Sequence, residues 1–179
     1  MIEVPDLSDG VVRCRPPGRG DVDAVHAGSQ DPAVVRFTRI PVPYTRVHAQ
    51  AFVRNAAHEL RAGTGAHLVV ADATTDALVG VCGLVLDRSR RSGEIGYWVV
   101  PEARGRGVAR RAVRLVAGWA LGDLGLLRVQ VMINAHNAAS QRVAEACGFR
   151  REGLLRSFED RLGERIDFVI GSVLPGELR

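Results

Sequence analysis

A short stretch rich in glycine and arginine has the residue types of an anion-binding site. Residues 94–100 alternate as a strand does, and Pro101 ends that strand because proline cannot donate to a ladder. Arg104-Gly105-Arg106-Gly107 follows, and an amphipathic helix begins at Val108. The free N–H groups and the dipole of a helix N-terminus favour negative charge, and glycine lets a phosphate approach closely. The spacing therefore predicts a phosphate site, the alternative being an ordinary strand–turn–helix connection.

This loop matches neither of two common nucleotide-binding motifs. No Gly-Lys-Ser/Thr follows it, and the third glycine of a dinucleotide fingerprint is missing. Arg-x-x-Gly-x-Ala, residues 104–109, instead resembles the acetyl-CoA pyrophosphate loop of the GNAT N-acetyltransferase superfamily, and the preceding Glu-Ile-Gly-Tyr-Trp-Val resembles its RimJ/RimL-like branch of ribosomal-protein N-terminal acetyltransferases. The resemblance implies that acetyl-CoA is the acetyl donor. It also implies a set of cofactor-binding residues: Trp98, Val99, Val100, Arg104, Gly105, Arg106, Gly107, Val108 and Ala109.

A second stretch, residues 137–149, resembles the family's Asn-x-x-Ala/Ser…Gly-Phe signature. In that signature the asparagine touches the pantetheine arm of the cofactor, whereas a plain helix cap is the other interpretation of Asn137, and one residue can do both. Many GNAT enzymes place a tyrosine, the proton donor to the thiolate, where this chain has Ala144. The RimJ/RimL-like group has a serine as the proposed donor at the position of Ser140. Because a thiol has a pKa of about 8.5, we expect Ser140 to assist rather than to be essential; an ordinary polar residue in a first helical turn is the alternative.

Glu94 is the candidate general base. Acyl transfer to an amine requires a neutral amine, a stabilised oxyanion and an accommodated thiolate. The resemblance implies direct attack in a ternary complex, with a backbone N–H near Val99 or Val100 polarising the thioester carbonyl. Glu94 shares a strand face with Trp98 and could act through a water, and a solvated strand carboxylate is the alternative. An α-amine has a pKa of about 8 and lysine about 10.4, which favours a protein or peptide N-terminus as the acceptor amine.

Two other functions stay open at this point. A small-molecule amine acetyltransferase, acting on an aminoglycoside, polyamine or amino-acid derivative, would need an acidic cleft for a polycation, and Asp87, Glu94 and Glu159 are the candidates. A non-catalytic acyl-CoA-binding module is the third hypothesis. The segment 167–171 follows the branch's Asp-x-x-x-aromatic pattern except for Gly171, and we expect the missing ring to remove bulk near the substrate.

Composition limits the remaining function classes. The chain has 179 residues and a net charge of +4, but no aromatic stacking array accompanies its arginines, so we expect no nucleic-acid partner. The cysteines Cys14, Cys82 and Cys147 show no metal-ligand spacing, which predicts reduced thiols in a cytoplasmic protein without a metal. The longest apolar run, residues 78–86, is too short to span a bilayer, and residues 1–10 do not resemble a signal peptide, so no membrane association is expected. A homodimer is suggested only by the resemblance to the branch.

The order of predicted elements indicates one α/β (mixed α+β) domain over residues 1–179. This domain is expected to have a central mixed, mostly antiparallel seven-stranded sheet with helices on both faces. The element order is that of the GNAT fold. Hydrophobic alternation and turn residues place the seven strands at 11–15, 67–71, 78–87, 94–100, 127–134, 149–158 and 165–174. Capping residues place helices at 21–27, from 31, at 46–62, from 108, and from 137 to 147.

Overall fold

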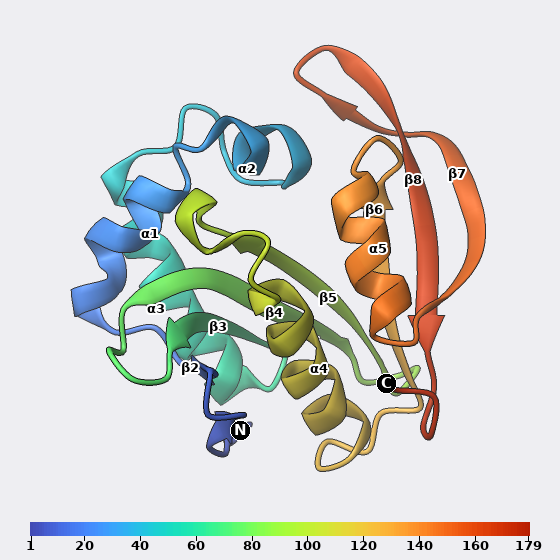
Figure 1. Ribbon diagram of the computed structural model, residues 1–179, viewed down its shortest axis with the longest axis horizontal. Coiled ribbons are helices and arrows are strands. Elements are labelled where there is room, and N and C mark those ends of the chain that lie inside the picture. The colour runs from blue at the N-terminus through green and yellow to red at the C-terminus, as the bar shows by residue number, and fades with distance from the viewer.

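An eight-stranded sheet forms the centre of the computed structural model, which describes residues 1–179 (Figure 1). The strands lie in the spatial order β1-β2-β3-β4-β5-β6-β8-β7. All neighbours are antiparallel except β5 and β6, so the predicted mixed, mostly antiparallel sheet is confirmed. The strand bounds are β1 Leu7–Ser8, β2 Val12–Arg15, β3 Gly65–Asp72, β4 Leu78–Asp87, β5 Ser92–Val99, β6 Arg128–Asn134, β7 Arg150–Arg161 and β8 Glu164–Val173.

Helices cover both faces of the sheet, as predicted (Figure 1). The helices α4 (Val108–Leu121) and α5 (Ala138–Ala146) pack on one face, where they enclose the main hydrophobic core. The helices α1 (Val22–Gly28) and α3 (Arg46–Ala62) cover the other face, over β3 and β4. Helix α2 (Pro32–Phe37) lies across from the tip of the β7–β8 hairpin, and two single 3₁₀ turns occupy Arg19–Asp21 and Pro101–Ala103.

The strand count is one higher than the seven strands predicted. The extra strand, β1, has two residues, Leu7 and Ser8, which pair antiparallel with Cys14 and Arg13 of β2. Two residues are too few to show an alternating hydrophobic pattern, so local patterning does not predict this strand. The turn that joins β1 to β2 is held by Asp9, whose carboxylate accepts hydrogen bonds from two backbone N–H groups.

The one parallel contact in the sheet is short. Strands β5 and β6 pair at only three positions, the last of which joins Glu94 to Gln130. Beyond this point β5 continues along β4 as far as Val99, while β6 continues along β8 as far as Asn134. The sheet therefore splits between two central strands, and this split is the feature that positions the candidate site.

A polar contact holds together the three strands on the far side of the split. Arg128 of β6 donates two hydrogen bonds to Glu152 of β7, at 2.8 and 2.6 Å, and Ser172 of β8 donates a third at 2.6 Å. The Arg128 guanidinium and the Ser172 hydroxyl lower the pKa of Glu152 from 4.5 to about 2. A carboxyl whose pKa is lowered by folding stabilises the native state above its unfolded pKa and loses that contribution as the pH falls.

We predict that Glu152→Gln lowers the free energy of unfolding at neutral pH by roughly 1 kcal/mol, since the ion pair is partly exposed and screened by solvent. The difference from wild type should shrink as the pH falls from about 4.5 to about 2, where the wild-type carboxyl also loses its charge. Urea unfolding at a series of pH values measures this. Glu164→Gln, at an exposed glutamate with no ion pair, is the control. A stability loss in E152Q that persists unchanged at the lowest pH would contradict the charge-based explanation.

Candidate functional site

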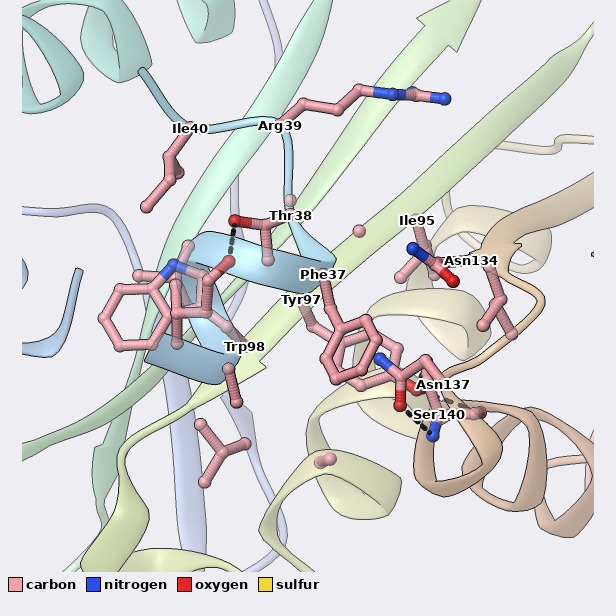
Figure 2. Close-up of a pocket in the computed structure, with 18 of the residues that line it drawn as sticks. Phe37, Thr38, Arg39, Ile40, Ile95, Tyr97, Trp98, Asn134, Asn137 and Ser140 are labelled. Carbon is pink, nitrogen blue, oxygen red and sulfur yellow. Dashed lines mark hydrogen bonds between the residues drawn. The ribbon is translucent and has the colours of Figure 1, made fainter. Parts of the chain in front are cut away.

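The split between β5 and β6 opens into a large cavity, with a volume of about 940 Å³. Side chains from α2 and the loop that follows it, from β5 and from the start of α5 converge on this cavity (Figure 2). The cavity reaches both faces of the sheet. Its lining includes the start of α4 on one face, and residues of α3, β3 and β4 on the other.

Backbone groups of β5 face the split on alternate residues. The N–H of Val100 donates to the carbonyl of Val79 at 3.0 Å, which turns Val100 toward β4. The carbonyl of Val99 instead accepts a hydrogen bond from Arg104 Nε at 3.0 Å, on the side away from β4. In a strand the N–H and C=O of one residue point to the same side, and successive residues point to opposite sides. The N–H groups of Val99 and Tyr97 therefore face the split. The expected N–H donor is therefore available at Val99 but not at Val100, whose N–H is already bonded.

The glycine–arginine loop presents a run of unpaired N–H groups. No backbone or side-chain acceptor within the protein bonds the N–H groups of residues 105–110. Gly105 and Gly107 have φ angles of +73° and +77°, which residues with a side chain rarely adopt. A Cβ at either position would meet nothing within 4 Å. Helix α4 also lacks a side-chain cap, whereas Asp31 and Asn137 cap α2 and α5. This end of α4 can therefore accept an anion, as the sequence predicts.

The two arginines of the loop have different environments. The Arg104 guanidinium donates to the Val99 carbonyl and, at 2.5 Å, to Asp31 Oδ1, so it ties the end of β5 to the start of α2. Burial acts to raise the pKa of Asp31, but Arg104 and the N–H groups at the start of α2 outweigh it and lower that pKa. Arg106 is exposed and forms no ion pair. The Arg104 side chain is thus held by protein groups, and Arg106 is the loop arginine whose charge is unpaired.

Asn137, Ser140 and Tyr97 form a hydrogen-bonded group at the start of α5 (Figure 2). Asn137 Oδ1 accepts the Ser140 N–H at 3.0 Å, which confirms its predicted role as the helix cap. Ser140 Oγ lies 2.7 Å from the Tyr97 hydroxyl, and burial raises the pKa of Tyr97, which keeps that hydroxyl protonated. All three side chains line the cavity.

Tyr97 is a site residue that the sequence analysis did not identify. The alternation of residues 94–100 places Tyr97 on the same strand face as Ile95 and Val99, and in the structure it is partly buried against the main core. That pattern carries no information on the partner of its hydroxyl. Ser140 lies 43 positions later in the sequence, so only the packing of α5 beside β5 brings the two hydroxyls together.

Glu94 lies at the point where the split begins. Its two carboxylate oxygens contact Gln130 Nε2 at 3.0 Å and Arg39 at 3.3 Å. Arg39 also bonds Glu159 of β7 at 2.6 Å, and its guanidinium lies 5.2 Å from the centre of the Phe168 ring. Two of the three acidic residues expected to form a cleft therefore converge.

The remaining sequence-predicted residues lie in different parts of the molecule. Asp87 bonds Ser89 and Arg90 in the turn after β4 and does not line the cavity. Trp98 lines the cavity through its ring on the α1 side, where a Cβ at Gly28 would come within 2.6 Å of it. The expectation for Gly171 is wrong: it lines a second cavity of about 730 Å³ beside the C-terminal tail, and a Cβ there would lie 3.0 Å from the Arg150 carbonyl.

The cysteines, the possible metal ligands and the helices complete the description of the expected features. The three cysteines are free and buried, and burial raises the pKa of Cys147 to about 11, which disfavours the nucleophilic thiolate. No group of three or more histidine, cysteine, aspartate or glutamate side chains is arranged to hold a metal ion. None of the helices has both the length and the apolar character needed to cross a membrane.

Comparisons with known proteins agree with the geometry. The family model described as an acetyltransferase (GNAT) domain matches residues 12–150. Among curated proteins, the uncharacterized N-acetyltransferase p20 of Bacillus licheniformis is 28% identical over 159 residues, which cover 88% of this chain and 89% of that protein.

Two solved structures show the same fold. Mycobacterium smegmatis RimJ in complex with CoA-disulfide has a TM-score of 0.83 and 24% identity, covering 94% of this chain and 84% of that one. The ribosomal-protein-S5-alanine acetyltransferase from Vibrio fischeri has a TM-score of 0.85 and 18% identity, covering 98% and 100%. The mixed sheet with helices on both faces is thus the fold that the sequence resemblance implied.

We predict that Gly107→Ala weakens the binding of acetyl-CoA at least tenfold. A Cβ would strain the left-handed backbone and project beside the unpaired N–H groups of the loop, where the resemblance places the pyrophosphate. Calorimetric titration with acetyl-CoA measures the effect. Gly176→Ala is the matched control, because Gly176 has a φ of +87° and equally open surroundings but lies near the C-terminus. Equal affinities for G107A and G176A would show that the loop does not hold the cofactor.

Proposed function

Because the chain belongs to the acetyltransferase (GNAT) family, we propose that it transfers the acetyl group of acetyl-CoA to a primary amine, the N-terminal α-amine of a protein or peptide. The observation that carries this proposal is the run of unpaired N–H groups at residues 105–110, which opens into the cavity between β5 and β6. These N–H groups can donate hydrogen bonds to a pyrophosphate. From them the cavity continues to its other end, where Glu94 lies.

The cofactor would extend along the split in the sheet. Its pyrophosphate would bind the N–H groups of the loop, with Arg106 adding an unpaired positive charge. Its pantetheine arm would take the place of the missing strand neighbour of β5, bonding the N–H groups that face the split, with Asn137 alongside. The RimJ structure, which has the same fold, holds CoA-disulfide, and this supports a coenzyme A thioester as the cofactor of this chain.

The acceptor amine would enter from the opposite end of the cavity, beside Glu94. An α-amine is largely protonated at neutral pH and must lose a proton before it attacks the thioester. Glu94 can bind the ammonium and take up this proton, directly or through a water, if Arg39 moves away from the oxygen that it contacts at 3.3 Å. The N–H of Val99 or Tyr97 would then polarise the thioester carbonyl.

The charges at the acceptor end favour a substrate with one positive charge. Glu94 and Glu159 are balanced there by Arg39 and Arg161, so the net field is close to neutral rather than acidic. The relative from Vibrio fischeri acts on a ribosomal-protein alanine, which supports an N-terminal acceptor for this chain. A polyamine is the second candidate, because the two carboxylates would be left free for a polycation if Arg39 were displaced.

The test is a direct assay of CoA release with three acceptors: peptides that begin with serine or with alanine, and spermidine. Acetyl-CoA should bind at one-to-one stoichiometry, and peptides with a free N-terminus should be acetylated faster than spermidine. Faster acetylation of spermidine would favour the second candidate. Saturable binding of acetyl-CoA without transfer to any of these amines would favour a non-catalytic binding module and reject the proposal.

We predict that Glu94→Gln lowers kcat/KM for the best peptide by about 100-fold, the usual effect of losing a general base. The affinity for acetyl-CoA should stay unchanged, because the phosphate loop lies at the other end of the cavity. Steady-state kinetics and calorimetry measure the two effects. Glu3→Gln, at an exposed glutamate without an ion pair, is the control. Normal turnover in E94Q would remove Glu94 from the mechanism.

We predict that Ser140→Ala and Tyr97→Phe each lower kcat by about tenfold or less, since a departing thiolate needs only weak assistance. If the two hydroxyls act as one hydrogen-bonded pair on the sulfur, the double variant should be hardly slower than either single variant. Single-turnover rates with a peptide acceptor measure this coupling. Fully multiplicative losses would show that the two hydroxyls act independently.

A further inference from the structure

A histidine–glutamate pair beside the acceptor end of the cavity has no part in the mechanism above. His67 of β3 and Glu59 of α3 are joined by a contact of 2.5 Å between His67 Nδ1 and Glu59 Oε2. Both side chains are about one-third exposed, and the ring also packs edge-on against Phe52. With Nδ1–H donated to the carboxylate, the other ring nitrogen, Nε2, is left as the proton acceptor.

Two glycines make room for this imidazole: the ring lies over one of them, and the space above the other is open. His67 pairs across the sheet with Gly83 of β4, which pairs with Gly96 of β5, so the three residues form one row on the same face. A Cβ at Gly83 would lie only 2.6 Å from His67 Cδ2 and 3.0 Å from Nε2, so the ring lies over Gly83. A Cβ at Gly96 would meet nothing within 4 Å. Because neighbouring strands are about 4.8 Å apart, a ring above Gly83 reaches toward the open space above Gly96.

This space belongs to the acceptor end of the cavity. His67, Gly83 and Gly96 all line it, and Glu94 is two residues before Gly96 on the same face of β5. Ionisable groups from several elements face the same cavity as His67. Glu59 contacts the ring from α3. The same cavity is also lined by His48 of α3, Glu94 of β5, Arg36 and Arg39 of α2 and the loop after it, and Glu159 and Arg161 of β7. Strand β4 contributes only valine and glycine to the lining.

Acetylation of an ammonium removes two protons from its nitrogen. The first leaves before attack and gives the neutral amine. After the nitrogen bonds to the thioester carbon, the second leaves the cationic nitrogen as the C–S bond breaks and the amide forms. The thiolate takes up one proton, so the overall reaction releases one proton to solvent. Glu94 accounts for one removal only.

We propose that His67, oriented by Glu59, is a second general base of this enzyme and accepts one of the two protons of the acceptor nitrogen at Nε2. The Glu59 carboxylate stabilises the imidazolium that results and fixes the ring orientation, which makes Glu59 a positioning residue. The proton then passes from the imidazolium to solvent, and the neutral ring is restored. This proposal rests on the proposed function, since it concerns the same acetyl transfer.

The test compares His67→Gln and Glu59→Gln with wild type, using the serine-initiated peptide and spermidine as acceptors. H67Q should lower kcat/KM by about 100-fold, and its pH profile should lose one ionisation on the acidic side. E59Q leaves the imidazole in place but removes the charge of the carboxylate that orients it, so kcat should fall about tenfold while KM stays unchanged. Acetyl-CoA affinity and the thermal midpoint should stay at wild-type values in both. His58→Gln, at an exposed histidine of α3 outside the cavity, is the matched control.

The outcomes separate this inference from the function on which it rests. Wild-type kinetics and an unchanged pH profile in H67Q, with active wild type, would reject the role of His67 and leave the proposed transferase standing. If H67Q does not fold, a kcat of E59Q equal to that of wild type would still overturn the proposal. Failure of wild type to acetylate either acceptor would reject both.

Discussion

The short parallel contact between β5 and β6 is the constraint on which the rest of the site depends. Once the pairing ends at Glu94 and Gln130, each strand keeps its other neighbour but loses the one across the split. An edge of a sheet inside a protein leaves N–H and C=O groups that need partners. Here those groups face a cavity of about 940 Å³, so an extended ligand with amide groups can complete the sheet.

The two ends of the cavity at the split differ in their charged groups as well as in their shape. At one end the N-terminus of α4 carries no side-chain cap, and Arg104 is held by Asp31 and the Val99 carbonyl, so this end is fixed and favours an anion. At the other end Arg39 lies between Glu94 and Glu159, a charge pattern suited to exchange with a cationic amine. One cavity can thus place a negatively charged cofactor and a positively charged acceptor in line.

The β7–β8 hairpin and the loop after α2 close the acceptor end from two sides. Arg161 of β7 donates to the carbonyls of Val35 and Ile40, and Arg39 from the loop reaches back to Glu159. These contacts join segments more than one hundred residues apart in the chain. The tip of the hairpin and the loop after α2 are largely exposed, and such surface connections vary most easily, which suits a part of the protein that would select the acceptor.

The sequence by itself determined the parts that depend on local patterns. Alternation, capping residues and the Arg104-Gly105-Arg106-Gly107 turn predicted the mixed sheet, the helices on both faces and the glycine-rich start of α4, because each is encoded within a few neighbouring residues. Tertiary structure alone decided the pairings across the chain: the Tyr97–Ser140 contact, the position of Gly171 on a second cavity, and the His67–Gly83–Gly96 row. Strand register and helix docking determine which side chains meet, and the spacing of neighbouring residues in the sequence predicts neither of them.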